Sequence, residues 1–217
     1  MSIKPFKIDA SNRGDHYYLT AEHECYFFYE FTAGKLAGHS QGNQLVMNLK
    51  KSVTKKSQID YKYKIKAIAD SAKLLNGAFL MGASVLSRAL VCPIPPSKIP
   101  GHAEYDDRMF QIASGACHGT GGECSELITQ LESYAAAHHQ QDGSRPKPSE
   151  LEANYKISQQ LDRQIVILVD DVLTTGSHFV AARNVILRTY PETRVIGFFM
   201  ARRALPDPAE EFSAIFD

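Results

Sequence analysis

The stretch VILVDDVLTTGSHF, residues 166–179, decides the fold. Its apolar first half predicts a buried strand over 164–169, and its second half predicts a turn that leads into a helix over 177–190. Between them the chain places two adjacent carboxylates, Asp170 and Asp171, followed by hydroxyl side chains and a glycine. Unbroken apolar strands are typical of parallel sheets that are covered on both faces, so the stretch indicates an α/β protein.

Strand and helix patterns alternate along most of the remaining chain. Residues 60–82 show the three- and four-residue apolar spacing of a helix, with Asp60 as the expected N-cap and Gly77 or Gly82 as its end. Further helices are expected at 103–117 and 149–161, and further strands at 88–94, 125–132 and 194–200. The alternation predicts a central, mostly parallel sheet flanked by helices.

The N-terminal part differs in composition from the remainder. Residues 15–32 are dense in Tyr, Phe and Thr, which predicts one or two strands, as in a hairpin. A glycine-rich loop is expected at 34–42, and the pattern at 43–51 fits either a strand or a helix. We therefore divide the chain into a small β-rich extension, or hood, at 1–58 and a core at 59–217.

Composition restricts the class of protein. The 217 residues are 44% hydrophobic and 22% charged, which suits an ordinary packed core and argues against disorder. Lys plus Arg equals Asp plus Glu at 24 each, so a globally basic nucleic-acid binder is not indicated. The polar N-terminus, the lack of a long apolar run and four cysteines without a C-x-x-C pair lead us to expect a cytoplasmic protein with free thiols and no membrane contact.

The acidic pair and the turn that follows it, residues 174–177, differ in the ligand groups that they suit. The hydroxyls and the glycine of the turn and the free backbone N–H groups of the following helix N-terminus suit a phosphate. The two carboxylates repel a phosphate, but they suit sugar hydroxyls or a hard cation such as Mg²⁺. A phosphorylated ribose satisfies both halves.

The run VILVDDVLTTG, residues 166–176, resembles the phosphoribosyl-pyrophosphate (PRPP) signature of the type I phosphoribosyltransferases. The resemblance implies that family's fold, a homodimer, and an Mg²⁺-dependent transfer of the 5-phosphoribosyl group from PRPP to a nitrogenous base with release of pyrophosphate. It also implies that the two acids hold the ribose 2′ and 3′ hydroxyls. The residues implied in binding the ribose and the 5′-phosphate are Asp170, Asp171, Val172, Leu173, Thr174, Thr175, Gly176 and Ser177. His178 departs from the pattern, because the family often has a small or hydroxyl residue there.

A second segment, VCPIPPSK at 91–98, resembles the pyrophosphate loop of the competence-associated branch of that family. Its prolines stiffen a loop that follows a strand, and its end offers a hydroxyl and a cation. The implied pyrophosphate contacts are Pro95, Pro96, Ser97, Lys98 and Arg108. Arg108 would bind pyrophosphate in bidentate fashion; the alternative is that it only decorates a helix end. A polar segment at 138–149 resembles the family's closing loop, and the implied catalytic set is Asp170, Asp171, Lys98 and Arg145.

Other interpretations of the acidic turn are weaker. A response-regulator receiver domain carries such a pair near its start, but only 46 residues follow Asp171 in the 217-residue chain. Two other functions stay open: a non-catalytic PRPP or nucleotide sensor, and an accessory module of a nucleic-acid pathway that uses the lysines of 50–66. A nucleic-acid partner is not favoured, because a solvated helix face explains those lysines more simply. No protein ligand of Mg²⁺ is assigned, since the oxygens of PRPP are expected to bind it.

Overall fold

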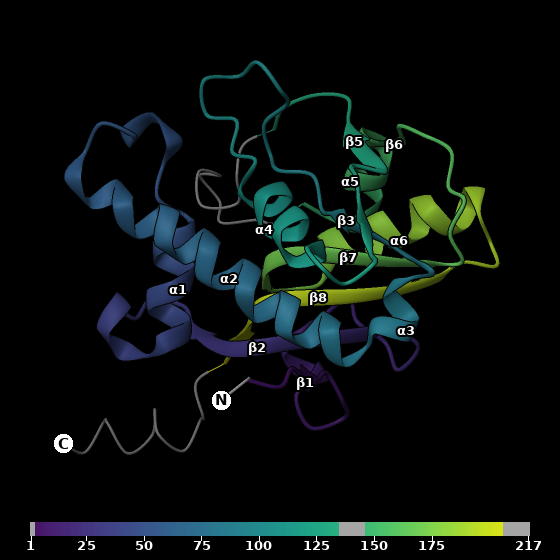
Figure 1. Cartoon of the computed structure of the whole chain (residues 1–217), viewed down its shortest axis with the longest axis horizontal. Helices are drawn as coiled ribbons and strands as arrows, with labels where there is room; N and C mark the ends of the chain where they lie inside the picture. The colour runs from purple at the N-terminus through teal and green to yellow at the C-terminus, as the bar shows by residue number, and fades with distance from the viewer. Residues whose placement is uncertain (1–2, 135–145, 206–217) are drawn as a thin grey trace.

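The computed structural model describes residues 3–134 and 146–205, and its centre is a six-stranded sheet (Figure 1). From edge to edge the strands are β1 (Phe6–Lys7), β2 (Glu24–Thr32), β8 (Arg194–Ala204), β7 (Ile165–Leu173), β3 (Ala89–Pro93) and β4 (Glu123–Cys124). β1 is antiparallel to β2, and every other neighbouring pair is parallel. The expected α/β class with a mostly parallel central sheet is therefore confirmed.

Helices cover both faces of the sheet. One face packs against α2 (Lys62–Met81) and α4 (Arg108–Cys117), and the other against α5 (Pro148–Asn154) and α6 (Ser177–Thr189). The α6 side also carries a two-stranded antiparallel sheet of β5 (Ile128–Gln130) and β6 (Tyr155–Ile157). Strand β7 is buried on both faces, because Val166 and Leu168 pack toward α6, whereas Ile167 and Val169 pack toward α2 and α4.

Helix α1 (Gln41–Leu49) lies beside the carboxyl end of β2. The segment 43–51, for which the sequence allowed a strand or a helix, is therefore mostly helical. The Ser40 side chain caps it by accepting from the Asn43 N–H at 3.0 Å. Asn43 is buried and donates to the carbonyls of Thr32 and Lys35, which ties the helix to β2. The remaining short helices are α3 (Ala83–Leu86) and four 3₁₀ turns, Arg13–Asp15, Ala37–His39, Val53–Lys55 and Ile59–Tyr61.

The expectation of a hairpin within 15–32 is wrong. A single strand, β2, occupies the second half of this range, and it pairs in parallel with β8, with Phe27 opposite Phe199. Its antiparallel partner is β1, which precedes the range. The aromatic pattern identified a strand, but the partner on its other side lies far along the chain, where no local pattern encodes the pairing. The sheet thus crosses the expected division at residue 58.

The long helix predicted at 60–82 is confirmed as α2, and Gly82 ends it. Asp60 is not its N-cap. Tyr61 occupies that position without a side-chain cap, and Asp60 instead pairs with Lys51 at 2.6 Å. The charge of Asp60 therefore serves a contact with the end of α1, which a helix pattern alone does not indicate.

The later predicted elements have shifted ends. The helix expected at 103–117 begins only at Arg108, and the strand expected at 125–132 shortens to β5. The helix expected at 149–161 ends at Asn154, because Tyr155 begins β6 and pairs with β5. Within residues 3–134 and 146–205, none of the helices has the length and apolar character that crossing a membrane requires.

Candidate functional site

Strand β7 is longer than the sequence indicated, and its length places the acidic pair. The strand continues through both carboxylates to Leu173, because β8 runs beside it and pairs Asp170 with Phe199 and Leu173 with Arg202. Asp170 and Asp171 therefore lie at the end of a strand and not in the turn. Successive strand residues point to opposite faces, so the two carboxylates enter different surroundings.

Asp171 faces the α2–α4 side, where cations bind it. Its Oδ2 accepts from Arg108 Nη2 at 2.6 Å, and Lys50 Nζ lies 3.8 Å from its Oδ1. The residue is 4% exposed. Burial alone would raise the pKa of Asp171, but Lys50 and Arg108 outweigh burial and hold the pKa well below its usual value. Asp171 is thus an anion at neutral pH, and its charge is already paired.

Arg108 is the centre of a buried ionic network. Its Nη1 donates to Asp106 Oδ2 at 2.6 Å, and the same oxygen accepts from Lys64 Nζ at 2.6 Å. Lys64 is 1% exposed and also donates to two backbone carbonyls at the end of α1. Burial lowers the pKa of Arg108, but Asp171 and Asp106 outweigh burial and raise it. The network Lys64–Asp106–Arg108–Asp171 joins α2, the start of α4 and β7.

This network shows which groups the Arg108 side chain contacts. The sequence suggested a pyrophosphate contact or a helix end, and the structure places Arg108 at the first position of α4 with a carboxylate on each Nη group. Its side chain is 19% exposed. In this arrangement Arg108 positions Asp171, and a contact with pyrophosphate through its remaining N–H groups stays a prediction.

Asp170 faces the α6 side, where aromatic residues surround it. Its Oδ1 accepts from the Asp171 N–H at 2.8 Å. The Tyr155 hydroxyl lies 3.0 Å from His178 Nδ1, and the Tyr134 ring stacks on His178 with 6.2 Å between centroids. Burial first, and then nearby groups that include Asp170, raises the pKa of both tyrosines. Burial and the charge of Asp171 raise the pKa of Asp170 to about 7. The site therefore combines one fixed and one titrating carboxylate.

Gly176 shapes the turn after β7. Its φ of +86° lies in the left-handed region that favours glycine, and a Cβ there would lie 2.8 Å from a Leu19 carbon. Gly176 is also the N-cap of the 13-residue α6, whose first N–H groups have no intrahelical partner. His16 Nδ1 donates to the Thr174 carbonyl and the Tyr18 N–H donates to the Thr175 carbonyl at 2.9 Å. The N-terminal segment thus braces the turn from its carbonyl side.

The other residues implied in phosphate binding differ in accessibility. Val172 and Leu173 are buried, and their side chains pack in the core. Ser177 is buried as well, and its Oγ accepts from Thr175 Oγ1 at 3.4 Å. Thr174 and Thr175 are half-buried. A phosphate here would therefore meet backbone N–H groups and the threonine hydroxyls, whereas the Ser177 hydroxyl, which the sequence analysis also assigned, is buried.

The proline-rich loop after β3 leaves the sheet directly beside the acidic pair. The Ile94 N–H donates to the Val169 carbonyl at 2.9 Å, which extends the β3–β7 pairing to the residue before Asp170. Pro95 is buried and Pro96 is half-buried. The Ser97 carbonyl accepts from the Tyr134 N–H at 3.0 Å, so the loop also touches the aromatic group around Asp170. The structure thus brings the two segments predicted to bind PRPP to one edge.

The two predicted cations of the pyrophosphate end are not both described. Lys98 Nζ lies 3.9 Å from Glu104 Oε2, and its side chain is 21% exposed. Arg145 lies outside the described residues. The structure therefore places Lys98 on the loop beside the acidic edge, with a weak and exposed partner that a pyrophosphate could replace.

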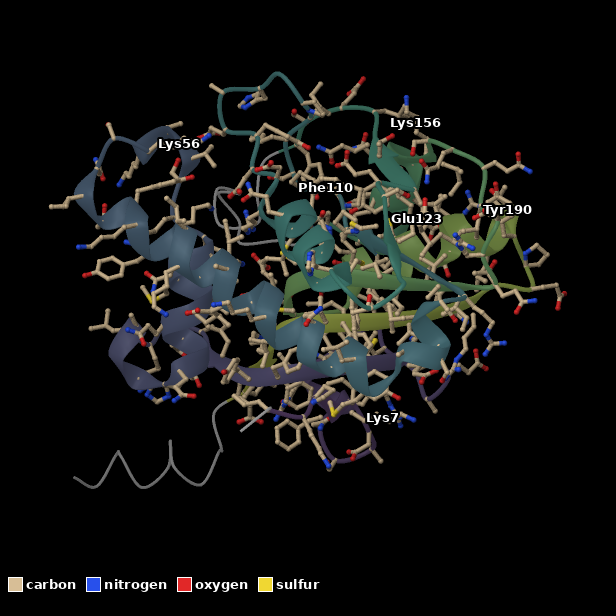
Figure 2. All side chains as sticks on the ribbon, viewed as in Figure 1. Lys7, Lys56, Phe110, Glu123, Lys156 and Tyr190 are labelled. Carbon is tan, nitrogen blue, oxygen red and sulfur yellow. The ribbon has the colours of Figure 1, made fainter. Side chains whose placement is uncertain are left out.

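The lysines of the 50–66 run are largely used within the protein. Lys64 is buried, and Lys51 and Lys66 form ion pairs of 2.6 and 2.5 Å with aspartates. Lys56 lies on the outer side of the segment between α1 and α2 (Figure 2). These contacts give the run a structural role, and they leave less free charge for nucleic acid than the sequence suggests.

No protein-family model and no curated protein matches this chain. The geometry of the edge is therefore the main support for a function. Within residues 3–134 and 146–205, no group of three or more His, Cys, Asp or Glu side chains is arranged to hold a metal ion. Sequence reasoning did not assign to the site the residues that lie around the acids and the turn, namely His16, Lys50, Lys64, Asp106, Tyr134 and Tyr155. The charges of residues 106–108 could have indicated an ionic cluster. Nothing in the sequence indicated that its partner is Asp171 on β7.

Proposed function

We propose that this protein binds PRPP and transfers its 5-phosphoribosyl group to a nitrogenous base with release of pyrophosphate. The observation that carries the proposal is the carboxyl edge of β7, where two carboxylates lie near the end of the strand and a left-handed glycine opens α6. Open parallel sheets bind ligands at this edge. The resemblance of residues 166–176 to the PRPP signature supports the same assignment.

The two acids would make unequal contributions to holding the ribose. Asp170 is half-buried, whereas Asp171 is almost fully buried and bound to Arg108. Asp170 is therefore the carboxylate better placed to accept from a ribose hydroxyl. Asp171 could offer Oδ1, which faces Lys50 at 3.8 Å. The 5′-phosphate would lie at the N-terminus of α6, where the helix dipole favours an anion.

The reaction breaks the bond between ribose C1 and a pyrophosphate oxygen, and the electron pair leaves with pyrophosphate. The base nitrogen donates its own pair to C1. Positive charge develops on the ribose, and the carboxylate of Asp170, which has no cation bound to it in the described structure, would stabilise that charge electrostatically. Lys98 would stabilise the departing pyrophosphate. Lys98 can leave Glu104 for this contact, because the Lys98–Glu104 ion pair is long and partly exposed.

A magnesium ion could bind at this edge if the substrate supplies most of its oxygen ligands. Mg²⁺ prefers oxygen ligands and is commonly bound by one or two carboxylates together with substrate phosphates. Asp170 is the protein carboxylate that fits this role, because Asp171 is already bound to Arg108. Bound Mg²⁺ would neutralise charge on the pyrophosphate.

Calorimetry with Mg²⁺-PRPP tests the proposal. We expect Asp170→Asn to weaken binding at least roughly tenfold, which is about 1.4 kcal/mol. Asp162→Asn is the control, because the Asp162 side chain is 77% exposed, and it should bind like the wild type. Equal affinity of wild type and Asp170→Asn, or no binding by the wild type, would contradict the proposal. Pyrophosphate release with a panel of bases then tests transfer.

A non-catalytic PRPP sensor is the second candidate, and the state of Asp171 favours it. An acid that is already bound to Arg108 can support ligand binding without the charge distribution that transfer needs. The two candidates differ in one measurement. PRPP binding that depends on Asp170, with no pyrophosphate release for any base of the panel, would favour the sensor.

A further inference from the structure

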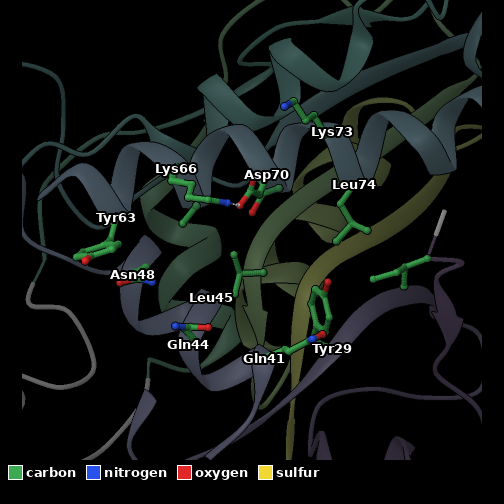
Figure 3. A pocket seen from close by; sticks show the side chains of 13 residues that line it. Tyr29, Gln41, Gln44, Leu45, Asn48, Tyr63, Lys66, Asp70, Lys73 and Leu74 are labelled. Carbon is green, nitrogen blue, oxygen red and sulfur yellow. Dashed lines mark hydrogen bonds and ion pairs between the residues drawn. The ribbon is translucent and has the colours of Figure 1, made fainter. Parts of the chain in front are cut away.

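A groove between α1 and α2 lies outside the PRPP edge and has its own lining (Figure 3). Its volume is about 710 Å³, within the range of ligand pockets. Figure 3 shows Gln44 and Asn48 on the α1 side, and Lys66 and Asp70 on the α2 side. Leu45 and Tyr29 lie between the two helices. The groove is therefore lined by both polar and apolar groups.

The α1 wall is a row of amides. Gln41, Gln44 and Asn48 are spaced by three and four residues, which places them on one face of the helix. Each amide offers both a donor and an acceptor. Paired donors and acceptors on side-chain amides match the edges of nucleobases, as Asn and Gln do when they read adenine. This wall therefore suits a planar heterocycle that carries both kinds of group.

The floor and the α2 wall add the remaining features of such a site. The rings of Tyr29 and Tyr63 belong to the lining, and aromatic rings are the groups on which bases stack. Lys62 Nζ lies over one face of the Tyr63 ring, 5.3 Å from its centroid. Ser71 lines the groove at 1% exposure, and its Oγ is buried without a hydrogen-bond partner in the described structure. At this exposure the Ser71 hydroxyl is part of the packed wall of α2, and the more accessible amides of α1 carry the polar recognition. Lys66 pairs with Asp70 at 2.5 Å, so the positive charge of Lys73 is left over among the lining residues and favours a phosphate at that wall.

Both helices that form the groove also contact the acidic edge. Lys50 follows α1 directly and lies 3.8 Å from Asp171. Lys64 belongs to α2 and is connected to Asp171 through Asp106 and Arg108. Each link of this chain, Lys64–Asp106, Asp106–Arg108 and Arg108–Asp171, is 2.6 Å long. Movement of α1 against α2 would therefore change the cations around Asp171. A ligand that fills the groove is placed to cause such a movement.

We propose that the α1–α2 groove binds a nucleoside, and that its occupation changes the affinity of the acidic edge for PRPP. The second half rests on the proposed function. Coupling between two sites is reciprocal, so PRPP must change the affinity for the nucleoside by the same factor.

Calorimetry on the full chain with adenosine, guanosine, cytidine and uridine, and with their 5′-monophosphates, tests the site. We expect at least one of these ligands to bind. Gln44→Leu and Asn48→Leu should each weaken it at least roughly tenfold. Gln111→Leu is the matched control, an exposed glutamine on α4, and should have no effect.

Each other outcome has a definite meaning. No binding by any of the ligands overturns the proposal, and so does binding that Gln44→Leu and Asn48→Leu leave unchanged. Binding that is lost in Asp170→Asn but not in the groove variants places the nucleoside at the acidic edge and also overturns it. Nucleoside binding in the groove without any PRPP binding removes the proposed function but leaves the groove site. Binding of both ligands with no mutual effect overturns the coupling.

Discussion

Replacing Arg108 by methionine tests the ionic network. The change removes two hydrogen bonds of 2.6 Å and leaves Asp171 and Asp106 without their shared cation. Asp171 is 4% exposed, so water cannot readily replace the lost partner. Removing one member of a buried ion pair costs about 3–5 kcal/mol, because the other charge stays buried. We expect the free energy of unfolding at neutral pH to fall by that amount.

Urea unfolding followed by circular dichroism measures this loss. With a slope of about 2 kcal/mol per molar urea, the midpoint of Arg108→Met should fall by about 1.5–2.5 M. Arg188→Met is the matched control, because the Arg188 side chain is 66% exposed in its ion pair with Glu152. An exposed pair contributes less than about 1 kcal/mol, so the control should unfold close to the wild type.

The dependence on pH shows whether the charge of Asp171 causes the loss. In the wild type its pKa is lowered, so its contribution is present above the unfolded pKa of about 4 and is lost as pH falls through the folded pKa. Without Arg108, burial favours the protonated acid, so the loss should shrink as pH falls toward about 4. Arg108→Met/Asp171→Asn should recover at least about half of it. A loss below about 1 kcal/mol at neutral pH, or one that does not depend on pH, would refute the reasoning.

Three further changes have defined outcomes. The raised pKa of Asp170, about 7, means that wild-type stability falls as pH rises from about 4 through 7. Asp170→Asn should therefore stabilise at pH ~8 by up to about 4 kcal/mol, which is about three pH units at about 1.4 kcal/mol each, and not at pH ~4, as thermal unfolding at both values will show. In Gly42→Ala the new Cβ would lie 1.9 Å from the Glu30 carbonyl oxygen; urea unfolding should show a loss of about 1–3 kcal/mol. Gly176→Ala should cost about 1–2 kcal/mol and weaken Mg²⁺-PRPP binding in calorimetry.

The fold was predictable where local patterns determine it. The apolar run before Asp170 predicted β7, because a strand buried on both faces is apolar throughout. The spacing of apolar residues in 60–82 predicted α2, because a helix buried on one face repeats them every three or four residues. The errors concern pairing between distant segments. Residues 15–32 contain a strand, yet its parallel neighbour β8 begins at Arg194, and only the assembled sheet shows this contact.

The acidic pair shows the same limit at the level of chemistry. Adjacent aspartates look equivalent in a sequence, and a family resemblance gives them equivalent roles. The extension of β7 by a few residues turns them to opposite faces, and the partner that fixes the charge of Asp171 is Arg108, 63 residues earlier. Asp171 then has a structural role in the ionic network, whereas Asp170 keeps a titrating and half-buried carboxylate. Neutralising Asp171 should therefore disturb folding first, and neutralising Asp170 should disturb the ligand first.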